Sequence, residues 1–338
     1  MKRHANLSVF VPHVGCPQRC IFCDQNEISG AARAPSPAEV TALCERYLPA
    51  PGAGADTEIA FFGGSFTAVE RGYMTALLEA AQPFIRAGRA KGVRLSTRPD
   101  AVGDDVLDVL ARYRVTAIEL GAQSMDDAVL AANRRGHTAA DARSACARIR
   151  ARGGWQLGLQ MMLGMYGEED PQAGALRTAR EFIAMRPDTV RIYPTLVMEN
   201  TPLCALWRQG EYTPLTAEAA VGITAQLLGM FGRAGIGVIR VGLHSDASLR
   251  EHVAAGPFHP AFGELCYARA MRDKLEAALA AAGMPERAAA LVHPSQVSRA
   301  VGYARGNIAW FAARGVALTV RADASVPEDS VRLQTQDT

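Results

Sequence analysis

The chain has 338 residues, of which 49% are hydrophobic and 21% are charged, and its formal net charge is +2. This composition is ordinary for a globular protein, and so small a net charge provides no global attraction to nucleic acid. The N-terminal residues lack the apolar core of a secretory signal peptide, and no run of eighteen apolar residues predicts a membrane span. Four of the seven cysteines are widely scattered, as expected of buried thiols in a reducing compartment, so we expect a cytoplasmic protein.

Short apolar runs alternate along the chain with longer segments of helical periodicity. Strands are predicted at 7–12, 58–63, 92–97, 115–122, 155–162, 189–194 and 237–243. Helices are predicted between them at about 37–48, 68–87, 104–113, 126–132, 139–152, 171–185 and 216–234. Apolar strands regularly separated by helices are typical of parallel βαβ units. We therefore predict an α/β protein with a full or partial TIM-like (β/α) barrel, whose chemistry lies at the carboxyl ends of the strands.

The alternation weakens after about residue 245, where a loop rich in Gly, His and Pro begins. A helix from about 261, a second helix at about 296–314 and a strand at about 316–321 follow. We interpret residues 1–243 as the barrel domain, 244–324 as a C-terminal α/β extension that covers the barrel, and 325–338 as a flexible tail.

Polar residues, glycines and prolines collect where the predicted strands end. "GGSFT" follows the second strand, "RPD" the third, "LGMYGE" the fifth, and "YPT" overlaps the end of the sixth. The fourth strand carries Glu119 and is followed by Gln123 and Ser124. Because the carboxyl ends of parallel strands meet at one end of a barrel, these groups are expected to lie together.

Three cysteines, Cys16, Cys20 and Cys23, lie within eight residues just after the first predicted strand. A Cys-x3-Cys-x2-Cys loop can supply three thiolates to one iron–sulfur cluster and leave one iron open to another ligand. A structural zinc site would need a fourth ligand, and His13 is the only nearby candidate. The spacing therefore favours a 4Fe–4S cluster over zinc.

This cysteine spacing, with Phe22 just before the last cysteine, resembles the radical S-adenosylmethionine (SAM) superfamily. The resemblance implies that the open iron binds the methionine part of SAM, and that reductive cleavage of SAM gives a 5′-deoxyadenosyl radical. It also implies a reducing partner such as flavodoxin or ferredoxin. "FFGGSFT" is similar to the superfamily's glycine-rich element, which places Gly63, Gly64 and Ser65 at the methionine ammonium. Glycine allows the close backbone approach that such a contact needs.

Three longer segments resemble the radical domain of the Elongator catalytic subunit. They are "STRPD" (96–100), "IELGAQSMDDAVLAANRRGHT" (118–138) and "VRIYPTLVMENTPLCALWRQGEY" (190–212). By motif, the resemblance places Arg98, Glu119, Gln123 and Ser124 around SAM. Two departures limit it: the first cysteine spacing is shorter here, and the chain ends too soon to include an acetyltransferase domain. The resemblance therefore implies a short bacterial form and leaves the substrate open.

Candidate catalytic residues are His244 and His259, expected over the barrel mouth, and Tyr193 at the end of the sixth strand. Each histidine has the alternative of an ordinary loop residue that hydrogen-bonds to backbone.

Two basic stretches are candidates for contact with nucleic acid. The first is Arg134, Arg135, Arg143, Arg148, Arg150 and Arg152. The second joins Arg299, Arg305 and Arg314 with Tyr303, Trp310 and Phe311. Arginines beside aromatic rings suit single-stranded RNA, although such aromatics also occur as ordinary core residues.

Three functions follow as hypotheses. The first is a radical SAM enzyme acting on tRNA or another RNA base, without contact to a membrane. The second is a radical oxidase of a small molecule or tetrapyrrole. The third is a non-catalytic iron–sulfur sensor or carrier. The sequence does not indicate the oligomeric state.

Overall fold

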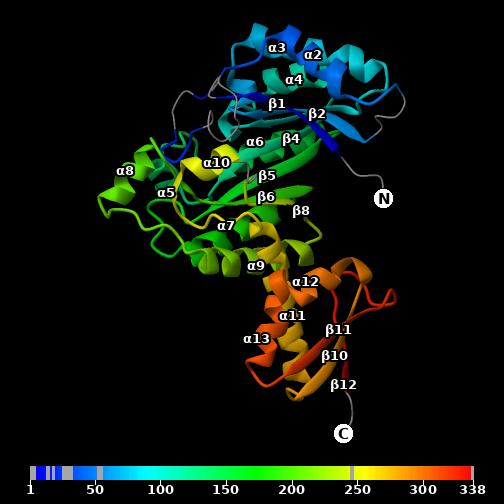
Figure 1. Ribbon diagram of the computed structural model, residues 1–338. Helices are drawn as coiled ribbons and strands as arrows, with labels where there is room; N and C mark the ends of the chain where they lie inside the picture. Colours follow the sequence, from blue (N-terminus) through cyan, green and yellow to red (C-terminus); the bar gives the residue numbers. More distant parts are fainter. Residues whose placement is uncertain are drawn as a thin grey trace.

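The computed structural model describes residues 5–12, 16, 20–24, 33–51, 56–243 and 247–335. Its centre is a sheet of seven strands in the order β1-β2-β3-β4-β5-β6-β8, and all six neighbouring pairs are parallel (Figure 1). The strands are β1 (Ala5–Val11), β2 (Thr57–Gly63), β3 (Gly92–Thr97), β4 (Val115–Gln123), β5 (Gln156–Leu163), β6 (Thr189–Pro194) and β8 (Gly237–Val241). This curved parallel sheet confirms the predicted partial barrel, and every predicted strand is present within a few residues.

Helices follow the strands and cover one face of the sheet (Figure 1). They are α2 (Pro37–Tyr47), α3 (Arg71–Arg86), α4 (Asp104–Arg112), α5 (Asp127–Ala132), α6 (Ala139–Arg152), α7 (Pro171–Met185), α8 (Pro202–Arg208) and α9 (Ala217–Arg233). Local signals determine several starts: Ser36 with Glu39, and Thr138 with Asp141, form capping boxes that satisfy free backbone N–H groups. Helix α8 is short and was not predicted.

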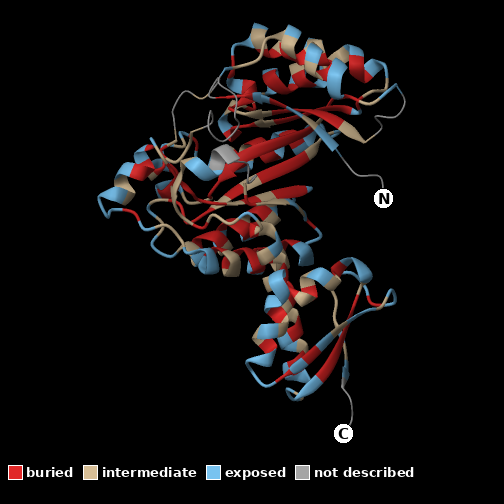
Figure 2. Ribbon diagram, viewed as in Figure 1, coloured by how far each residue is buried: buried red, intermediate tan, exposed pale blue. Residues whose placement is uncertain are grey.

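Strand residues alternate between two environments. One set, including Phe61, Leu95 and Leu159, packs against the helices in a single large apolar core, drawn red in Figure 2. The residues between them, including Glu58 and Arg94, lie on the opposite side of the strands, which we call the inner face. The period of two along a strand produces this separation, so the inner face is free to carry polar groups.

Residues after the seventh sheet strand form two groups. Helix α10 (Ala247–His252) leads into β9 (Val253–Ala255), which pairs antiparallel with β7 (Val197–Met198). Helix α11 (Phe262–Ala281) then packs against α9 and leads into a separate sheet of order β11-β10-β12, with its own apolar core. Its remaining elements are β10 (Arg287–Val292), α12 (Val297–Val301), α13 (Gly306–Ala312), β11 (Ala317–Ala322) and β12 (Arg332–Thr335). We call residues 262–335 the C-terminal unit.

The C-terminal unit lies below α9 and β8 in Figure 1, beside the barrel. The proposed domain boundary at 243/244 adjoins residues 244–246, which lie outside the described residues, so the division into domains stays a prediction. No helix in the described part of the chain is long and apolar enough to cross a bilayer.

Two predicted elements of the C-terminal unit were wrong. The predicted helix 296–314 is interrupted at Gly302, whose φ is 81°, and by Ala304 and Arg305 in the left-handed region. Such φ values cannot continue a right-handed helix. Within the predicted flexible tail, β12 pairs antiparallel with β10 in the register Ala288↔Thr335 to Leu291↔Arg332.

Candidate functional site

The cysteine segment is held at the carboxyl end of the sheet by Ile21. This side chain is 3% exposed and packs with Val197 and Leu203. Its backbone N–H donates to the Asn133 carbonyl at 3.3 Å, and its carbonyl accepts from the Leu203 N–H at 2.9 Å. Backbone contacts to α5 and α8 on either side therefore position Cys20 and Cys23.

Cys16 lies beside the glycine-rich turn after β2. Its Sγ is 3.9 Å from Ser65 Oγ, and the Gly64 N–H donates to the Val11 carbonyl at 2.8 Å. Gly63 has φ 109°, a conformation that favours glycine. The turn thus brings Gly63, Gly64 and Ser65 together with the first cysteine, as the sequence predicted.

Two arginines lie close to the thiols. Arg98 is 6% exposed, and its guanidinium makes two hydrogen bonds of 2.7 Å to the Asp100 carboxylate. The pKa of Arg98 is raised mainly by these bonds and also by the nearby Cys20 and Cys16. Arg135 donates to Cys20 Sγ at 3.0 Å and to the Gly121 carbonyl at 2.5 Å. The sequence placed Arg135 only within a basic stretch and did not indicate its contact with a thiol. Its position in "NRRGHT", at the end of a segment that resembles the Elongator radical domain, was the signal for a role in the site.

The end of β4 is strained at Gln123. This residue has φ 64° and is 9% exposed, and its Oε1 has no hydrogen-bond partner among the described residues. A buried residue in the left-handed region with an unsatisfied oxygen is typical of a ligand site. The neighbouring Ser124 is 2% exposed, and its Oγ accepts from the Asp126 N–H at 3.2 Å. Gln123 is thus oriented by strained backbone, with an acceptor free to bind a donor.

Glu119 has a different environment from the one expected for a group that is free to bind SAM. It is 1% exposed, and both its carboxylate oxygens are occupied by arginines, Arg94 on the adjacent β3 and Arg191 on β6, two strands away. Arg94 Nη1 lies 2.8 Å from Oε1, while Arg191 Nε lies 2.6 Å from Oε2. Arg94 also pairs with Glu58 at 2.7 Å. Glu119 is therefore the centre of a buried charge network on the inner face, and its contact with SAM stays a prediction.

The three catalytic candidates do not gather at one point. The half-buried Tyr193 lies on β6, where its hydroxyl is 3.4 Å from Arg191 Nη1. His259 accepts the Ala261 N–H at 3.0 Å and contacts the Tyr303 ring edge-on at 5.5 Å, which suits a structural role. His244 lies outside the described residues. Their catalytic roles stay predictions.

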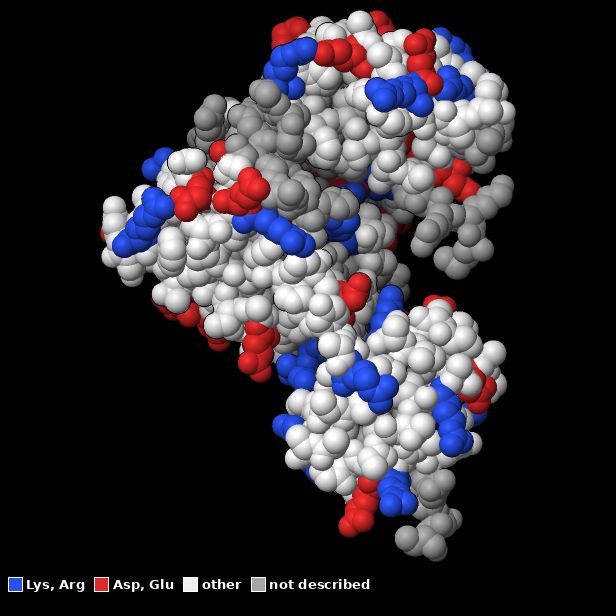
Figure 3. All heavy atoms as spheres, viewed as in Figure 1, with Lys and Arg blue, Asp and Glu red and all other residues white. Residues whose placement is uncertain are grey.

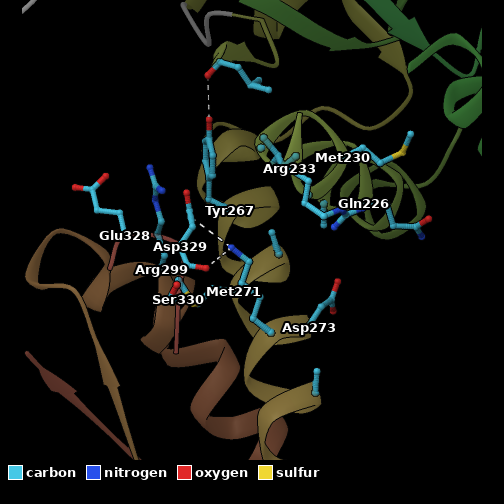
Figure 4. A pocket seen from close by; sticks show the side chains of 18 of the residues that line it. Gln226, Met230, Arg233, Tyr267, Met271, Asp273, Arg299, Glu328, Asp329 and Ser330 are labelled. Carbon is cyan, nitrogen blue, oxygen red and sulfur yellow. Dashed lines mark hydrogen bonds and ion pairs between the residues drawn. The ribbon is translucent and has the colours of Figure 1, made fainter. Parts of the chain in front are cut away.

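A separate cleft of about 1390 Å³ lies between the barrel and the C-terminal unit. Figure 4 shows its walls, with Arg233 on α9, Tyr267 on α11, and Arg299 and Asp329 on the C-terminal unit. The Arg299 guanidinium lies over the Tyr267 ring at 4.2 Å, and Lys274 pairs with Asp329 at 3.5 Å. Of the predicted RNA-contacting arginines, Arg299 lines this cleft, and none of the predicted cofactor residues does.

The residues at the carboxyl end fit a cluster with SAM. Thiols lie beside two guanidinium groups, a glycine turn permits close approach, and a buried amide oxygen lacks a donor. Within the described residues, no three His, Cys, Asp or Glu side chains converge as a metal-binding group. The assignment of Cys16, Cys20 and Cys23 as ligands therefore stays a prediction.

Comparisons with known proteins agree with this chemistry. The model of the radical SAM superfamily matches residues 10–178, and that of the radical SAM C-terminal domain matches 187–272. The tRNA uridine(34) acetyltransferase of Dehalococcoides mccartyi is 27% identical over 253 residues, covering 65% of this chain and 55% of that protein. The enzyme of the same name from Methanocaldococcus jannaschii is 32% identical over 149 residues, covering 43% and 27%. The chain thus spans about half the length of these relatives, or less.

A solved structure shares the fold. The archaeal Methanocaldococcus infernus Elp3 with an N-terminal deletion superimposes with a TM-score of 0.62 at 21% identity, covering 83% of this chain and 63% of that one. The predicted resemblance to Elongator radical domains is confirmed by these relatives, and the match to the radical SAM superfamily confirms the two expected cofactors, a 4Fe–4S cluster and SAM. The chain belongs to the radical SAM superfamily and is a radical SAM enzyme.

Proposed function

We propose that this enzyme acts in the cytoplasm on a base of RNA, with tRNA as the substrate. The observation that carries the proposal is the contact of Cys20 with Arg135 and of Cys16 with Ser65, at the carboxyl end of the barrel. The Cys16–Ser65 contact supports a single site for the cysteines and the glycine-rich turn, and Arg135 adds a positive group beside Cys20. The choice of RNA as the substrate is based on the relatives, whose names include tRNA uridine.

When bound, the cluster and SAM supply the radical chemistry, and the chain's residues bind and orient them. We assign Cys16, Cys20 and Cys23 to the cluster, and the remaining residues to SAM: Gly63, Gly64, Ser65, Arg98, Glu119, Gln123 and Ser124. Among these, Gln123 has a free acceptor for a donor of SAM, whereas Glu119 acts mainly by holding Arg94 and Arg191 in place. The electron comes from a reducing partner such as flavodoxin or ferredoxin.

The C-terminal unit offers surfaces for RNA. Arg314 lies 3.5 Å from the centre of the Trp310 ring, Arg272 lies 4.7 Å from it, and Tyr303 is 48% exposed. Phe311 is fully buried, so it belongs to the core and not to this surface. Basic and acidic groups are interspersed on the face in Figure 3, so phosphate contacts must be local.

The metal assignment is tested by anaerobic reconstitution with iron and sulfide, which should give about four irons per chain. Replacing any of Cys16, Cys20 or Cys23 by alanine should abolish the cluster absorbance. The matched control is Cys204→Ala, because Cys204 is buried on α8 in the same part of the structure. A complete, redox-active cluster in Cys16→Ala would contradict the ligand assignment.

The substrate is tested by titrating tRNA at several salt concentrations. Binding should weaken as salt rises, and replacing Arg299, Arg305 and Arg314 by alanine should reduce the salt dependence, by roughly 0.7 log units per lost phosphate contact on single strands. Arg86→Ala, an exposed arginine on α3, is the control. Absence of tRNA binding even at low salt would favour the small-molecule or tetrapyrrole oxidase. Absence of SAM cleavage by the reduced enzyme would favour the non-catalytic sensor.

A further inference from the structure

Two arginines lie side by side on the inner face at one end of the sheet. Arg191 of β6 and Arg240 of β8 are register partners, and Tyr193 is two residues further along β6. The intervening Val190 and Ile192 pack into the helix-side core, so the inner face is the side that carries Arg191 and Tyr193. Both Tyr193 and Arg240 are half-buried.

Arg191 is already engaged. It pairs with Glu119, and its guanidinium lies 4.9 Å from the centre of the Phe62 ring. Since Phe62 belongs to β2, this contact shows that the inner faces of β2 and β6 approach each other across the barrel. Phe10 of β1 is the register partner of Phe62 and is 36% exposed, so the inner face carries two neighbouring aromatic side chains, one of which contacts Arg191.

Arg240 has no carboxylate partner among the described residues. Its Nε donates to the Gly242 carbonyl at 3.1 Å, which leaves its two terminal nitrogens available. Burial lowers the pKa of Arg240; the Tyr193 hydroxyl raises it and the charge of Arg191 lowers it further. Because desolvating an unpaired charge is costly, an anionic partner would stabilise this half-buried guanidinium.

The inner face carries more positive than negative charge. Five ionised side chains on this face of the described strands contact one another or lie in register. They are Glu58, Arg94, Glu119, Arg191 and Arg240. The three arginines outnumber the two glutamates by one, and within the described part of the chain Arg240 is the arginine that no glutamate contacts. One positive charge therefore remains on this part of the inner face.

The position of Arg240 separates it from the expected cofactor. Among the described residues, Cys16 contacts Ser65 after β2, Cys20 contacts Arg135 after β4, and Arg98 after β3 interacts electrostatically with both thiols. In the strand order, β6 and β8 lie at the opposite end from β1 and β2. On β8, Arg240 is thus separated in the sheet from the strands that these cysteine interactions follow, which leaves it available to a group of the substrate.

We propose that Arg240, with Arg191 and Tyr193, forms a subsite for an anionic group of the substrate, which is a phosphate if the substrate is RNA. The RNA part of this assignment rests on the proposed function. A guanidinium offers paired N–H donors that match phosphate oxygens, and a tyrosine hydroxyl adds a further donor. Phe10 and Phe62 present aromatic surface on which a base attached to that phosphate can stack.

The first test compares uridine monophosphate with uridine on the reconstituted enzyme. Wild type should prefer the monophosphate by about tenfold or more, as expected for a charged hydrogen-bonded contact. Arg240→Gln should lose this preference, Arg240→Lys should recover part of it, and Arg86→Gln should keep it. Equal binding of nucleotide and nucleoside by wild type would overturn the subsite. Equal urea midpoints for all variants would establish that folding is unchanged.

Two further measurements identify the anion. SAM affinity should be the same in Arg240→Gln as in wild type; weaker SAM binding would assign the contact to the SAM carboxylate and overturn the proposal. With tRNA, Arg240→Gln should reduce the salt slope by about one phosphate contact. An unchanged slope in a variant that binds tRNA as tightly as wild type would overturn the subsite and leave the RNA function intact. If no tRNA binds but the preference for the monophosphate persists, the subsite stands and the RNA function fails.

Discussion

The guanidinium of Arg135 donates a hydrogen bond to Cys20 Sγ across 115 residues of sequence, at 3.0 Å. Its other terminal nitrogen donates to the Gly121 carbonyl, so β4 fixes the direction of the contact. A positively charged donor on a cluster thiolate stabilises the more negative, reduced cluster. Hydrogen bonds to cluster sulfurs and nearby charge are known determinants of reduction potential.

We predict that Arg135→Gln lowers the reduction potential of the reconstituted cluster. The expected shift is about 60 mV for each 1.4 kcal/mol of lost stabilisation in this one-electron couple. Redox titration followed by electron paramagnetic resonance measures it, with iron content determined in parallel. Arg134→Gln, an exposed neighbour, should leave the potential unchanged. A potential that stays constant or rises in Arg135→Gln would contradict the role of this contact.

Glu119→Ala should lower the free energy of unfolding by about 3–5 kcal/mol, because it leaves Arg94 and Arg191 buried without their shared carboxylate. Urea denaturation measures this loss. The matched control is Glu181→Ala, which breaks the exposed Arg143–Glu181 pair and should cost less than about 1 kcal/mol. If the role of Glu119 is limited to binding SAM, Glu119→Ala will unfold like wild type and only its affinity for SAM will change.

His137 should make the protein less stable as the pH falls. Its ring is 5% exposed, and burial lowers its pKa from 6.5 to about 4. The unfolded chain therefore takes up the proton first, so stability is complete above about pH 6.5 and is lost as the pH falls towards 4. The loss is roughly 3 kcal/mol at most. His137→Gln should remove this part of the pH dependence. If the free energy of unfolding changes with pH in the same way in the variant and in wild type, the prediction is refuted.

Glu168 should make the protein less stable as the pH rises, which is opposite to the effect of His137. Burial raises its pKa from 4.5 to about 7, so its protonated form is favoured in the folded protein. Its contribution is present below about pH 4.5 and is lost as the pH rises through 7. Glu168→Gln should therefore gain stability relative to wild type between pH 4.5 and 8, by roughly 3 kcal/mol at most. A difference between the two proteins that does not vary with pH would exclude this effect. Since the His137 and Glu168 slopes oppose each other, single variants are needed to resolve them.

The sequence alone determined the barrel strands and indicated the chemistry of the cysteine segment, both through local patterns. Strands such as 58–63 and 189–194 are predicted correctly because one face of each is buried under helices and is therefore apolar. The cysteine spacing indicated a cluster because three thiols within eight residues are close in any fold. In the C-terminal unit, where composition is Ala-rich throughout, the same reasoning missed β10 and the break at Gly302.

Only the tertiary structure decided which groups meet across strands. Glu119 is 25 residues from Arg94 and 72 from Arg191, and its pairing depends on strand order and register. The contact of Arg135 with Cys20, and the position of Arg240 beside Arg191, depend on the same geometry. No local pattern encodes these relationships, because a strand specifies which side a residue takes but not which residue lies opposite.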